Sequence, residues 1–346
     1  MKHQTTRYGE IPFYKIGTFG NTADAFISKK LFLEYKTKYS FPKKGDILIS
    51  ASGTIGRAVI YDGKPAYFQD SNIVWIDNDE TLVKNDFLFY AYSNVKWNTE
   101  HTTILRLYND NFRNTLIPLP SLNEQIAIAD ILSALDRYLY TLDALILKKE
   151  SVKKALSFEL LSQRKRLKGF NQAWQRVRLG DIANYLTSNL SAEQITQQGK
   201  IKVYDVNNFI GYTDTTFISD KPYISIVKDG SVGRVRILPP KTNILSTMGA
   251  LIANHRTTTE FLFYLLSNFD FKNFTSGSII PHIYFKDYKE KTIFLPPLNE
   301  QSAIANILSG LDNEIISLKN KKRQFENIKK ALNHDLMSAK IRVLEK

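Results

Sequence analysis

The stretch LPSLNEQIAIADILSALD, residues 119–136, returns 176 positions later as LPPLNEQSAIANILSGLD, residues 295–312. The two copies are identical at 14 of 18 positions. The similarity extends in both directions, because FLFYAYSN at 87–94 matches FLFYLLSN at 261–268, and KKAL occurs at both 153–156 and 329–332. A repeat over this distance indicates the duplication of a whole structural unit.

Each copy of the stretch is predicted to start a long amphipathic helix. Apolar residues recur at intervals of four and three, which predicts a heptad seam. The seam residues are Ile128, Leu132, Leu135, Leu139, Leu142 and Ile146, and in the second copy Ile304, Leu308, Leu311, Ile315 and Leu318. We expect Asn123 and Asn299 to be the N-caps, with Glu124 and Glu300 in the first turn, where the helix dipole favours negative charge.

The two helices are predicted to pair with each other. Each would run about 40 residues, or roughly 60 Å, and cannot bury its seam alone. Packing of each helix on its own domain is one alternative. Two nearly identical seams in one chain pair more simply as an antiparallel coiled coil related by a pseudo-twofold axis.

The segments before the two helices differ more between the copies. GDILIS at 45–50, NIVWI at 72–76 and YISIV at 223–227 predict short strands, whereas the two FLFY stretches predict short helices whose aromatic residues belong to a core. The sequence therefore predicts an α+β protein in four parts. Mixed α/β domains span residues 1–118 and 171–294, and helical connectors span residues 119–170 and 295–346.

Composition limits the compartment and the partners. With 47 Lys and Arg against 34 Asp and Glu, the net charge of +13 favours a polyanion, nucleic acid before an anionic membrane surface. The absence of cysteine excludes disulfides and thiolate chemistry. No apolar run reaches the roughly 20 residues that cross a bilayer, and the N-terminus lacks the apolar stretch of a signal peptide. We expect a cytoplasmic protein.

The sequence contains no recognisable catalytic motif. The five histidines, His3, His101, His255, His282 and His334, are far apart and form no His-Glu-x-x-His zinc motif. A P-loop and a Gly-x-Ser-x-Gly elbow are absent as well. We therefore expect no catalytic residue, no metal site and no cofactor, although a dispersed acidic nuclease site stays an alternative.

Two pairs of segments contain candidate DNA-contacting residues. GTIGR at 53–57 and GSVGR at 230–234 place an arginine after two glycines, which suits phosphate or guanine contacts and equally suits a plain surface turn. The polar segments TTILRLYNDNFRN at 102–114 and SIIPHIYFKDYKE at 278–290 share Tyr108/Tyr284 but diverge in charge, as two readers of different sequences or two drifting loops would. The candidates are Arg57, Arg106, Asn109, Asn111, Arg113, Arg234, His282, Lys286 and Lys289. The lysine-rich helix ends favour a solvated face.

The layout resembles the DNA-specificity subunit of type I restriction-modification systems. The resemblance lies in the Leu-Pro-x-Leu-Asn-Glu-Gln stretches at 119–125 and 295–301, the long helices, the Gly-x-x-Gly-Arg turns, and WQRVRLGDIANY at 174–185. It implies a noncatalytic protein in which two target-recognition domains each read half of a split double-stranded DNA target. It also implies that the helices set the spacer and dock two methyltransferase subunits, with restriction subunits joining for cleavage. S-adenosylmethionine, ATP and magnesium then belong to those partners.

Two other functions stay open, and one feature departs from the duplication. The alternatives are a coiled-coil interaction protein that binds nucleic acid nonspecifically, and a self-contained enzyme. The departure is in the first domain. If IPFYKI at 11–16 corresponds to IKVYDV at 201–206, the first copy has no counterpart of residues 174–190. The first domain tolerates this loss, or the allele is shortened or recombined, or a partner chain completes the domain. Of these alternatives we expect a shortened allele.

Overall fold

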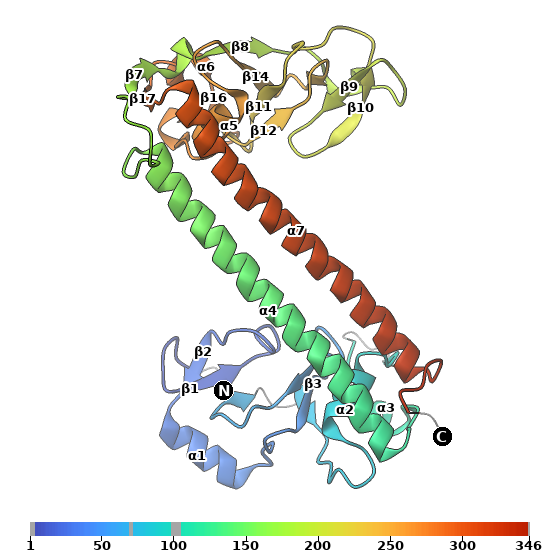
Figure 1. Ribbon diagram of the computed structural model, residues 1–346. Coiled ribbons are helices and arrows are strands. Elements are labelled where there is room, and N and C mark those ends of the chain that lie inside the picture. Colours follow the sequence, from blue (N-terminus) through green and yellow to red (C-terminus); the bar gives the residue numbers. More distant parts are fainter. Residues whose placement is uncertain (1–3, 69–71, 98–104, 345–346) are drawn as a thin grey trace. The chain divides into compact units, whose positions relative to one another are not determined.

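The computed structural model describes residues 4–68, 72–97 and 105–344. The chain forms two compact units, the first from residues 1–143 and 320–346, the second from residues 144–319. The long helices α4 (Leu122–Leu161) and α7 (Leu298–Met337) each contribute part of their length to both units (Figure 1). Each unit therefore consists of a mixed α/β part and a pair of helix halves.

The first unit has two three-stranded sheets beside its helices. Its elements before α4 are β1 (Ile11–Tyr14), β2 (Ala25–Ile27), α1 (Lys29–Lys38), β3 (Ile47–Ser50), β4 (Ala58–Ile60), β5 (Tyr67–Phe68), β6 (Ile73–Trp75), α2 (Asn85–Tyr92) and α3 (Asn109–Arg113). One sheet has the order β2-β1-β5, with β1 antiparallel to β2 and parallel to β5. The other has the order β4-β3-β6 and is antiparallel throughout.

The second unit repeats this plan and adds strands. Its elements between α4 and α7 are β7 (Gln175–Arg178), η1 (Leu179–Asp181), β8 (Ala183–Thr187), η2 (Ala192–Gln194), β9 (Ile201–Tyr204), β10 (Phe209–Thr213), β11 (Tyr223–Val227), β12 (Val235–Leu238), β13 (Asn243–Ile244), β14 (Met248–Ala253), α5 (Thr259–Ser267), η3 (Lys272–Phe274), β15 (Thr275–Ser276), β16 (His282–Ile283), α6 (Phe285–Tyr288) and β17 (Thr292–Leu295). The sheets have the orders β10-β9-β13, β12-β11-β14-β8, β15-β16 and β17-β7.

The sheet orders confirm that the α/β parts are duplicated. The sheet β10-β9-β13 has the same pairing directions as β2-β1-β5, and β12-β11-β14 matches β4-β3-β6. The predicted strands at 45–50, 72–76 and 223–227 are β3, β6 and β11, and the two FLFY stretches are α2 and α5. Strands equivalent to β7 and β8 are missing from the described residues of the first unit, and α1 has no counterpart in the second.

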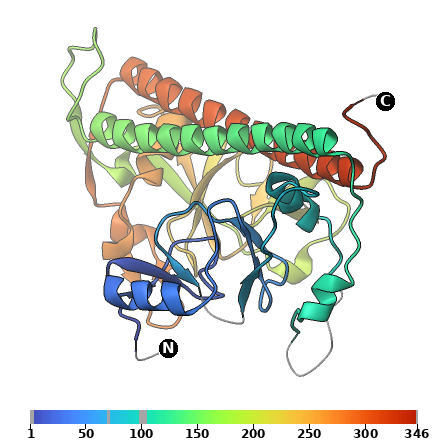
Figure 2. The ribbon, with the colours of Figure 1, turned by 90° about the horizontal axis from the view of Figure 1, so that it is seen from below.

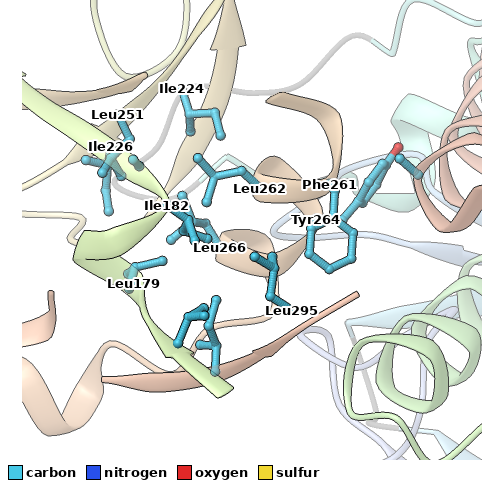
Figure 3. Packing of buried hydrophobic residues seen from close by; sticks show 14 of the residues in the cluster. Leu179, Ile182, Ile224, Ile226, Leu251, Phe261, Leu262, Tyr264, Leu266 and Leu295 are labelled. Carbon is cyan, nitrogen blue, oxygen red and sulfur yellow. The ribbon is translucent and has the colours of Figure 1, made fainter. Parts of the chain in front are cut away.

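The main core of the second unit contains residues of the sheet β12-β11-β14-β8, of α5 and of both helix halves. Leu179 and Ile182, which follow β7, are fully buried and lie beside Leu262 and Leu266 of α5 (Figure 3). Burying one such aliphatic side chain stabilises a fold by about 1.5–3 kcal/mol. The segment from β7 to β8 is therefore an integral part of this core.

The helix halves pack antiparallel within each unit, as predicted. In the first unit Asp136 and Asp143 of α4 pair with Lys329 and Lys322 of α7. The residue numbers of α7 fall as those of α4 rise, so the two helix halves run in opposite directions. The ribbons of α4 and α7 lie side by side in Figure 2. In the second unit Lys149 and Lys153 of α4 pair with Glu314 and Asp312 of α7. Exposed ion pairs contribute little energy, so the main stabilisation comes from the apolar seam.

The seam itself agrees with the heptad prediction. Ile128, Leu132, Leu142 and Ile146 of α4 are buried, and so are Ile304, Leu308 and Ile315 of α7. The remaining predicted seam residues, Leu135, Leu139, Leu311 and Leu318, are half-buried. The predicted N-caps are wrong, however. Both helices begin one residue before the asparagines. The Ser121 side chain caps α4 by accepting a hydrogen bond from the Glu124 amide. The first backbone hydrogen bond of α7 runs from the Gln301 amide to the Pro297 carbonyl.

Candidate nucleic-acid interface

The Gly-x-x-Gly-Arg stretches form the same tight turn in both units. Gly53 and Gly56 have φ angles of 66° and 80°, and Gly230 and Gly233 have 84° and 80°. Glycine adopts this left-handed region without the steric cost that other residues meet. The second glycine also lets an aromatic ring approach, because a Cβ on Gly233 would lie 2.6 Å from the ring of Phe271. A Cβ on Gly56 would likewise collide with the indole of Trp97.

The arginine after each turn is exposed and anchored to its own unit. Arg57 donates a hydrogen bond to the carbonyl oxygen of Phe19 at 3.0 Å. Arg234 donates to the side-chain oxygen of Asn207 at 2.9 Å. These contacts support the surface-turn interpretation. A guanidinium has five N–H donors, so one such anchor still leaves each arginine able to contact a phosphate or a base.

Each turn lies directly beside the polar segment of its unit. In the first unit the Leu107 amide donates to the Ala51 carbonyl at 2.8 Å, and Ser52 forms a β-bridge with Arg106. In the second unit the Ile283 amide donates to the Lys228 carbonyl at 2.9 Å, and Asp229 forms the equivalent bridge with His282. Two stretches that are distant in sequence therefore form one surface in each unit. We call it the turn–segment surface, residues 50–57 with 105–114 and residues 227–234 with 281–290.

An exposed tyrosine stands at the same position of both surfaces. The guanidinium carbon of Arg106 lies 5.8 Å from the ring centroid of Tyr108. The His282 ring lies 6.5 Å from the Tyr284 ring at an interplanar angle of 20°, and Lys286 Nζ is 5.5 Å from the same ring. The aromatic residue is thus constant, while the cationic or titratable side chain against it differs between the units.

The His282 ring is held by a carboxylate. Its Nδ1 lies 2.7 Å from Oδ1 of Asp229. A carboxylate only accepts hydrogen bonds, so Nδ1 carries the proton, and in the neutral ring Nε2 is then an acceptor. The contact spans 53 positions of sequence and depends on the fold of the turn, so the sequence alone did not predict it.

Other candidate residues have structural contacts. The side-chain oxygen of Asn111 accepts a hydrogen bond from the Tyr108 amide at 2.6 Å and so caps α3. Arg113 forms an exposed pair with Asp110 at 3.3 Å. The Cβ of Lys289 packs over Gly180. Asn109 and Lys286 are exposed, and residues 102–104 of the first polar segment lie outside the described residues.

The repeated stretch has a second role that the sequence did not predict. The amide side chain of Gln301 is buried, and its Oε1 accepts from Thr257 Oγ1 at 2.9 Å and from the Thr258 amide at 3.0 Å. Its Nε2 donates to the carbonyls of Arg256 and Pro296. Gln125 makes the equivalent bonds to the Lys84 amide and the Leu82 and Pro120 carbonyls in the first unit. These glutamines attach each helix start to the loop before α5 or α2.

The glutamate of the stretch binds an arginine that follows the end of the other long helix. Glu300 is fully buried and accepts from Arg166, at 2.6 Å, and from the indole of Trp174, at 3.0 Å. Glu124 accepts from Arg342 at 2.7 Å. This hydrogen bond holds the pKa of Glu124 below its usual value. The prediction that both glutamates serve the helix dipole therefore captured only part of their role.

The last residue of the stretch joins three elements. Asp312 accepts from the Tyr264 hydroxyl of α5 at 2.9 Å and pairs with Lys153 of α4. Asp136 does the same with Tyr90 of α2 and Lys329 of α7. Burial first, and then the hydrogen bond to the aspartate, raises the pKa of both phenols above the usual value. Identity of Glu, Gln and Asp outside the apolar seam was the signal that could have revealed these contacts.

No group of three or more His, Cys, Asp or Glu side chains among the described residues is arranged to hold a metal ion. None of the helices placed by the structure is long and apolar enough to cross a membrane.

The family comparison matches both copies of the repeat. A family model described as "Type I restriction modification DNA specificity domain" matches residues 1–150 and 171–327. A protein of Haemophilus influenzae described as a type I restriction enzyme specificity subunit is 64% identical over 133 residues. That match covers 38% of this chain and 34% of the relative.

Two relatives from Methanocaldococcus jannaschii match most of the chain. The specificity subunit of type I restriction enzyme MjaX is 29% identical over 335 residues, which cover 86% of this chain and 79% of the relative. The MjaVIII specificity subunit is 26% identical over 362 residues, which cover 92% and 84%.

Solved structures share the fold. The crystal structure of the type I restriction-modification S subunit from M. genitalium aligns with a TM-score of 0.63 at 20% identity, over 97% of this chain and 91% of that one. A structure from work on complex assembly and conformational transition of a type I system aligns with a TM-score of 0.55 at 16% identity, over 85% and 82%. Two mixed α/β parts with two long antiparallel helices are thus the common architecture.

Proposed function

We propose a function from one premise: this chain belongs to the type I restriction-modification DNA specificity family, the noncatalytic, target-recognising part of a type I enzyme. Each unit reads one half of a split double-stranded DNA target. The observation that supports this is the turn–segment surface, which occurs twice on the same framework with different side chains. Two domains that share a framework but differ in their contacting side chains can prefer different DNA sequences.

The side chains against the two tyrosines suggest different base preferences. Arginine most often reads guanine through O6 and N7 in the major groove, so Arg106 suits a guanine in the first half-site. His282 in its neutral form, with the Nδ1 proton bound to Asp229, presents Nε2 as an acceptor. An acceptor suits the exocyclic amino group of adenine or cytosine. Arg57, Arg234, Lys286 and Lys289 are proposed to contact phosphates, which position a protein without reading sequence.

The helix pair is proposed to scaffold the enzyme. In the first unit Ile131, Tyr140 and Ile328 are exposed apolar residues on the helix surfaces. The second unit exposes the equivalent trio, Ile307, Ile316 and Val152. Exposed apolar residues that recur at equivalent positions suit a repeated partner contact. We propose that each trio docks one methyltransferase subunit, that restriction subunits join this complex, and that the helices set the spacing of the half-sites.

His282→Ala tests the reading of the second half-site. The complex with a methyltransferase subunit is titrated with a duplex that carries the sequence it methylates. It is also titrated with duplexes changed at single positions of that sequence and with a scrambled duplex. We expect the variant to lose discrimination at one position of one half-site, by about 1–3 kcal/mol. The matched variant Lys286→Ala should weaken binding to all duplexes alike and reduce its salt dependence.

Equal loss of affinity for all duplexes in His282→Ala would reject a base-reading role for this histidine. Unaltered protein that binds specific and scrambled duplexes equally, with a steep salt dependence, would instead support nonspecific nucleic-acid binding by a coiled-coil protein.

A further inference from the structure

The arginine after each Gly-x-x-Gly turn holds a hairpin loop against that turn. In the second unit Arg234 donates to the side-chain oxygen of Asn207, in the loop between β9 and β10. In the first unit Arg57 donates to the carbonyl of Phe19, in the loop between β1 and β2. A Cβ on Gly20, the next residue, would lie 3.5 Å from Cδ of Arg57. Each turn–segment surface is therefore extended by a third stretch of chain.

The two hairpin loops differ, although the strands around them are duplicated. Residues 15–24 join β1 to β2, whereas only residues 205–208 join β9 to β10. Their sequences, KIGTFGNTAD and DVNN, have little in common. A constant anchor that carries a variable loop is the arrangement expected of binding loops on a shared framework. The loops thus suit a further element that distinguishes the two half-sites.

The loop of the second unit is held in one conformation by several hydrogen bonds. The Asp205 carboxylate accepts from the amides of Asn207 and Asn208, at 2.7 and 2.6 Å. The Asp205 amide donates to the Asn208 carbonyl at 3.0 Å. Arg236 donates to the Asn207 carbonyl at 2.9 Å. Because these contacts order the loop before any ligand binds, binding costs less conformational entropy.

Asn208 is the residue of this loop whose side chain has no structural task. Asp205 caps the loop, Val206 packs against the core, and Asn207 binds the arginine. The Asn208 side chain is exposed and makes no hydrogen bond to a described residue. Asparagine is common in turns because it tolerates a left-handed backbone, but Asn208 does not have a positive φ angle. The loop itself therefore does not require an asparagine at position 208.

Cationic side chains flank the loop. Lys202 and Arg236 lie over the rings of Phe209 and Tyr204, the residues on either side of the loop. Arg234 binds the loop directly. The loop carries one carboxylate, whose oxygen already accepts from two amides. Such a surface attracts the phosphates of DNA, and the neutral carboxamide among the cations is then free to approach a base edge.

We propose that Asn208 reads one adenine of the second half-site in the major groove. Its Oδ1 accepts a hydrogen bond from the adenine N6 amino group, and its Nδ2 donates one to N7, which is the bidentate pairing that asparagine makes with adenine. Asn208 and His282 stand on different stretches of chain, so they read different base pairs. The inference rests on the proposed DNA function and adds a specificity-determining residue that lies outside both polar segments.

A modified base tests the contact in the complex with a methyltransferase subunit. 7-Deazaadenine lacks the N7 acceptor, and it replaces each adenine of the methylated sequence in turn, on either strand. Duplex binding is titrated for the unaltered chain and for Asn208→Ala. We expect the analogue at one adenine to weaken binding by the unaltered chain about tenfold. The same analogue should leave binding by Asn208→Ala unchanged, because that variant lacks the donor.

Asn313→Ala is the matched control, because it removes an exposed carboxamide from α7 of the same unit. It should respond to every analogue as the unaltered chain does. If Asn208→Ala binds all duplexes equally more weakly, or still responds to every analogue, the proposal is overturned, while reading by other residues stands. An unaltered complex that binds its target and a scrambled duplex alike would reject the proposed function and this inference with it.

Discussion

Gly230 and Gly233 lie in the same turn, but a side chain would be unfavourable at each for a different reason. Both have a left-handed φ, but a Cβ on Gly230 would meet nothing within 4 Å, whereas one on Gly233 would press into Phe271. We expect Gly230→Ala to lower the free energy of unfolding by about 1 kcal/mol, the cost of left-handed backbone. Gly233→Ala should cost about 1–3 kcal/mol more through overpacking.

Urea denaturation of the two variants measures this difference. The second unit can be followed through Trp174, which lies in its core. Equal costs for the two alanines would contradict the steric role assigned to Phe271.

Glu124 is expected to make stability depend on pH. Because its hydrogen bond from Arg342 lowers the pKa in the folded state below the ordinary value of 4.5, the carboxylate stabilises the fold above that pH. This contribution is lost as the pH falls through the lowered pKa. Urea midpoints measured from about pH 7 to pH 3 should therefore fall less steeply in Glu124→Gln than in the unaltered chain. Parallel curves would mean that the ion pair adds nothing to folding.

At the residue scale, the sequence predicted positions better than partners. It placed Arg106 and His282 at equivalent positions of two diverging segments, and the β-bridges confirm that equivalence. It did not predict that Asn111 caps a helix or that Asp229 holds His282, because those contacts depend on the local backbone geometry. Whether the nine candidate residues contact DNA stays a prediction.

At the scale of elements, heptad spacing predicted the helices and their antiparallel pairing. Periodicity reports which face is buried, and the seam follows directly from it. It says nothing about lysines at the edge of that face. Lys149, Lys153 and Lys329 are half-buried and pair with acidic residues of the opposite helix. The interpretation of the lysine-rich ends as a solvated face did not include these contacts.

Gln301 provides the clearest test of how an element is attached. Its buried amide makes four hydrogen bonds, two as acceptor and two as donor. Each contributes about 1 kcal/mol, and the groups left unsatisfied add a further penalty. We expect Gln301→Ala to destabilise the second unit by at least about 4 kcal/mol. Exposed Ser302→Ala on the same helix turn is the control, and a similar small loss in both variants would contradict this role.

At the scale of the whole molecule, the compact units do not both correspond to consecutive segments of the chain, because the first combines residues 1–143 with residues 320–346. The repeat predicts four consecutive parts, residues 1–118, 119–170, 171–294 and 295–346, and that division stays a proposal. The compact units instead combine each α/β part with halves of both helices. A linear repeat cannot reveal this exchange, because it follows from antiparallel pairing between the two copies.

The most direct test of the account replaces residues 1–118 with the corresponding segment of another specificity subunit. The chimaera and the unaltered chain are each co-expressed with a methyltransferase subunit, and methylated genomic positions are mapped by sequencing. If each unit reads one half-site, both proteins methylate a split motif, with one half changed in the chimaera and the other half and the spacer unchanged. A change in both halves, or methylation without a split motif, would contradict the reading of one half-site by each unit.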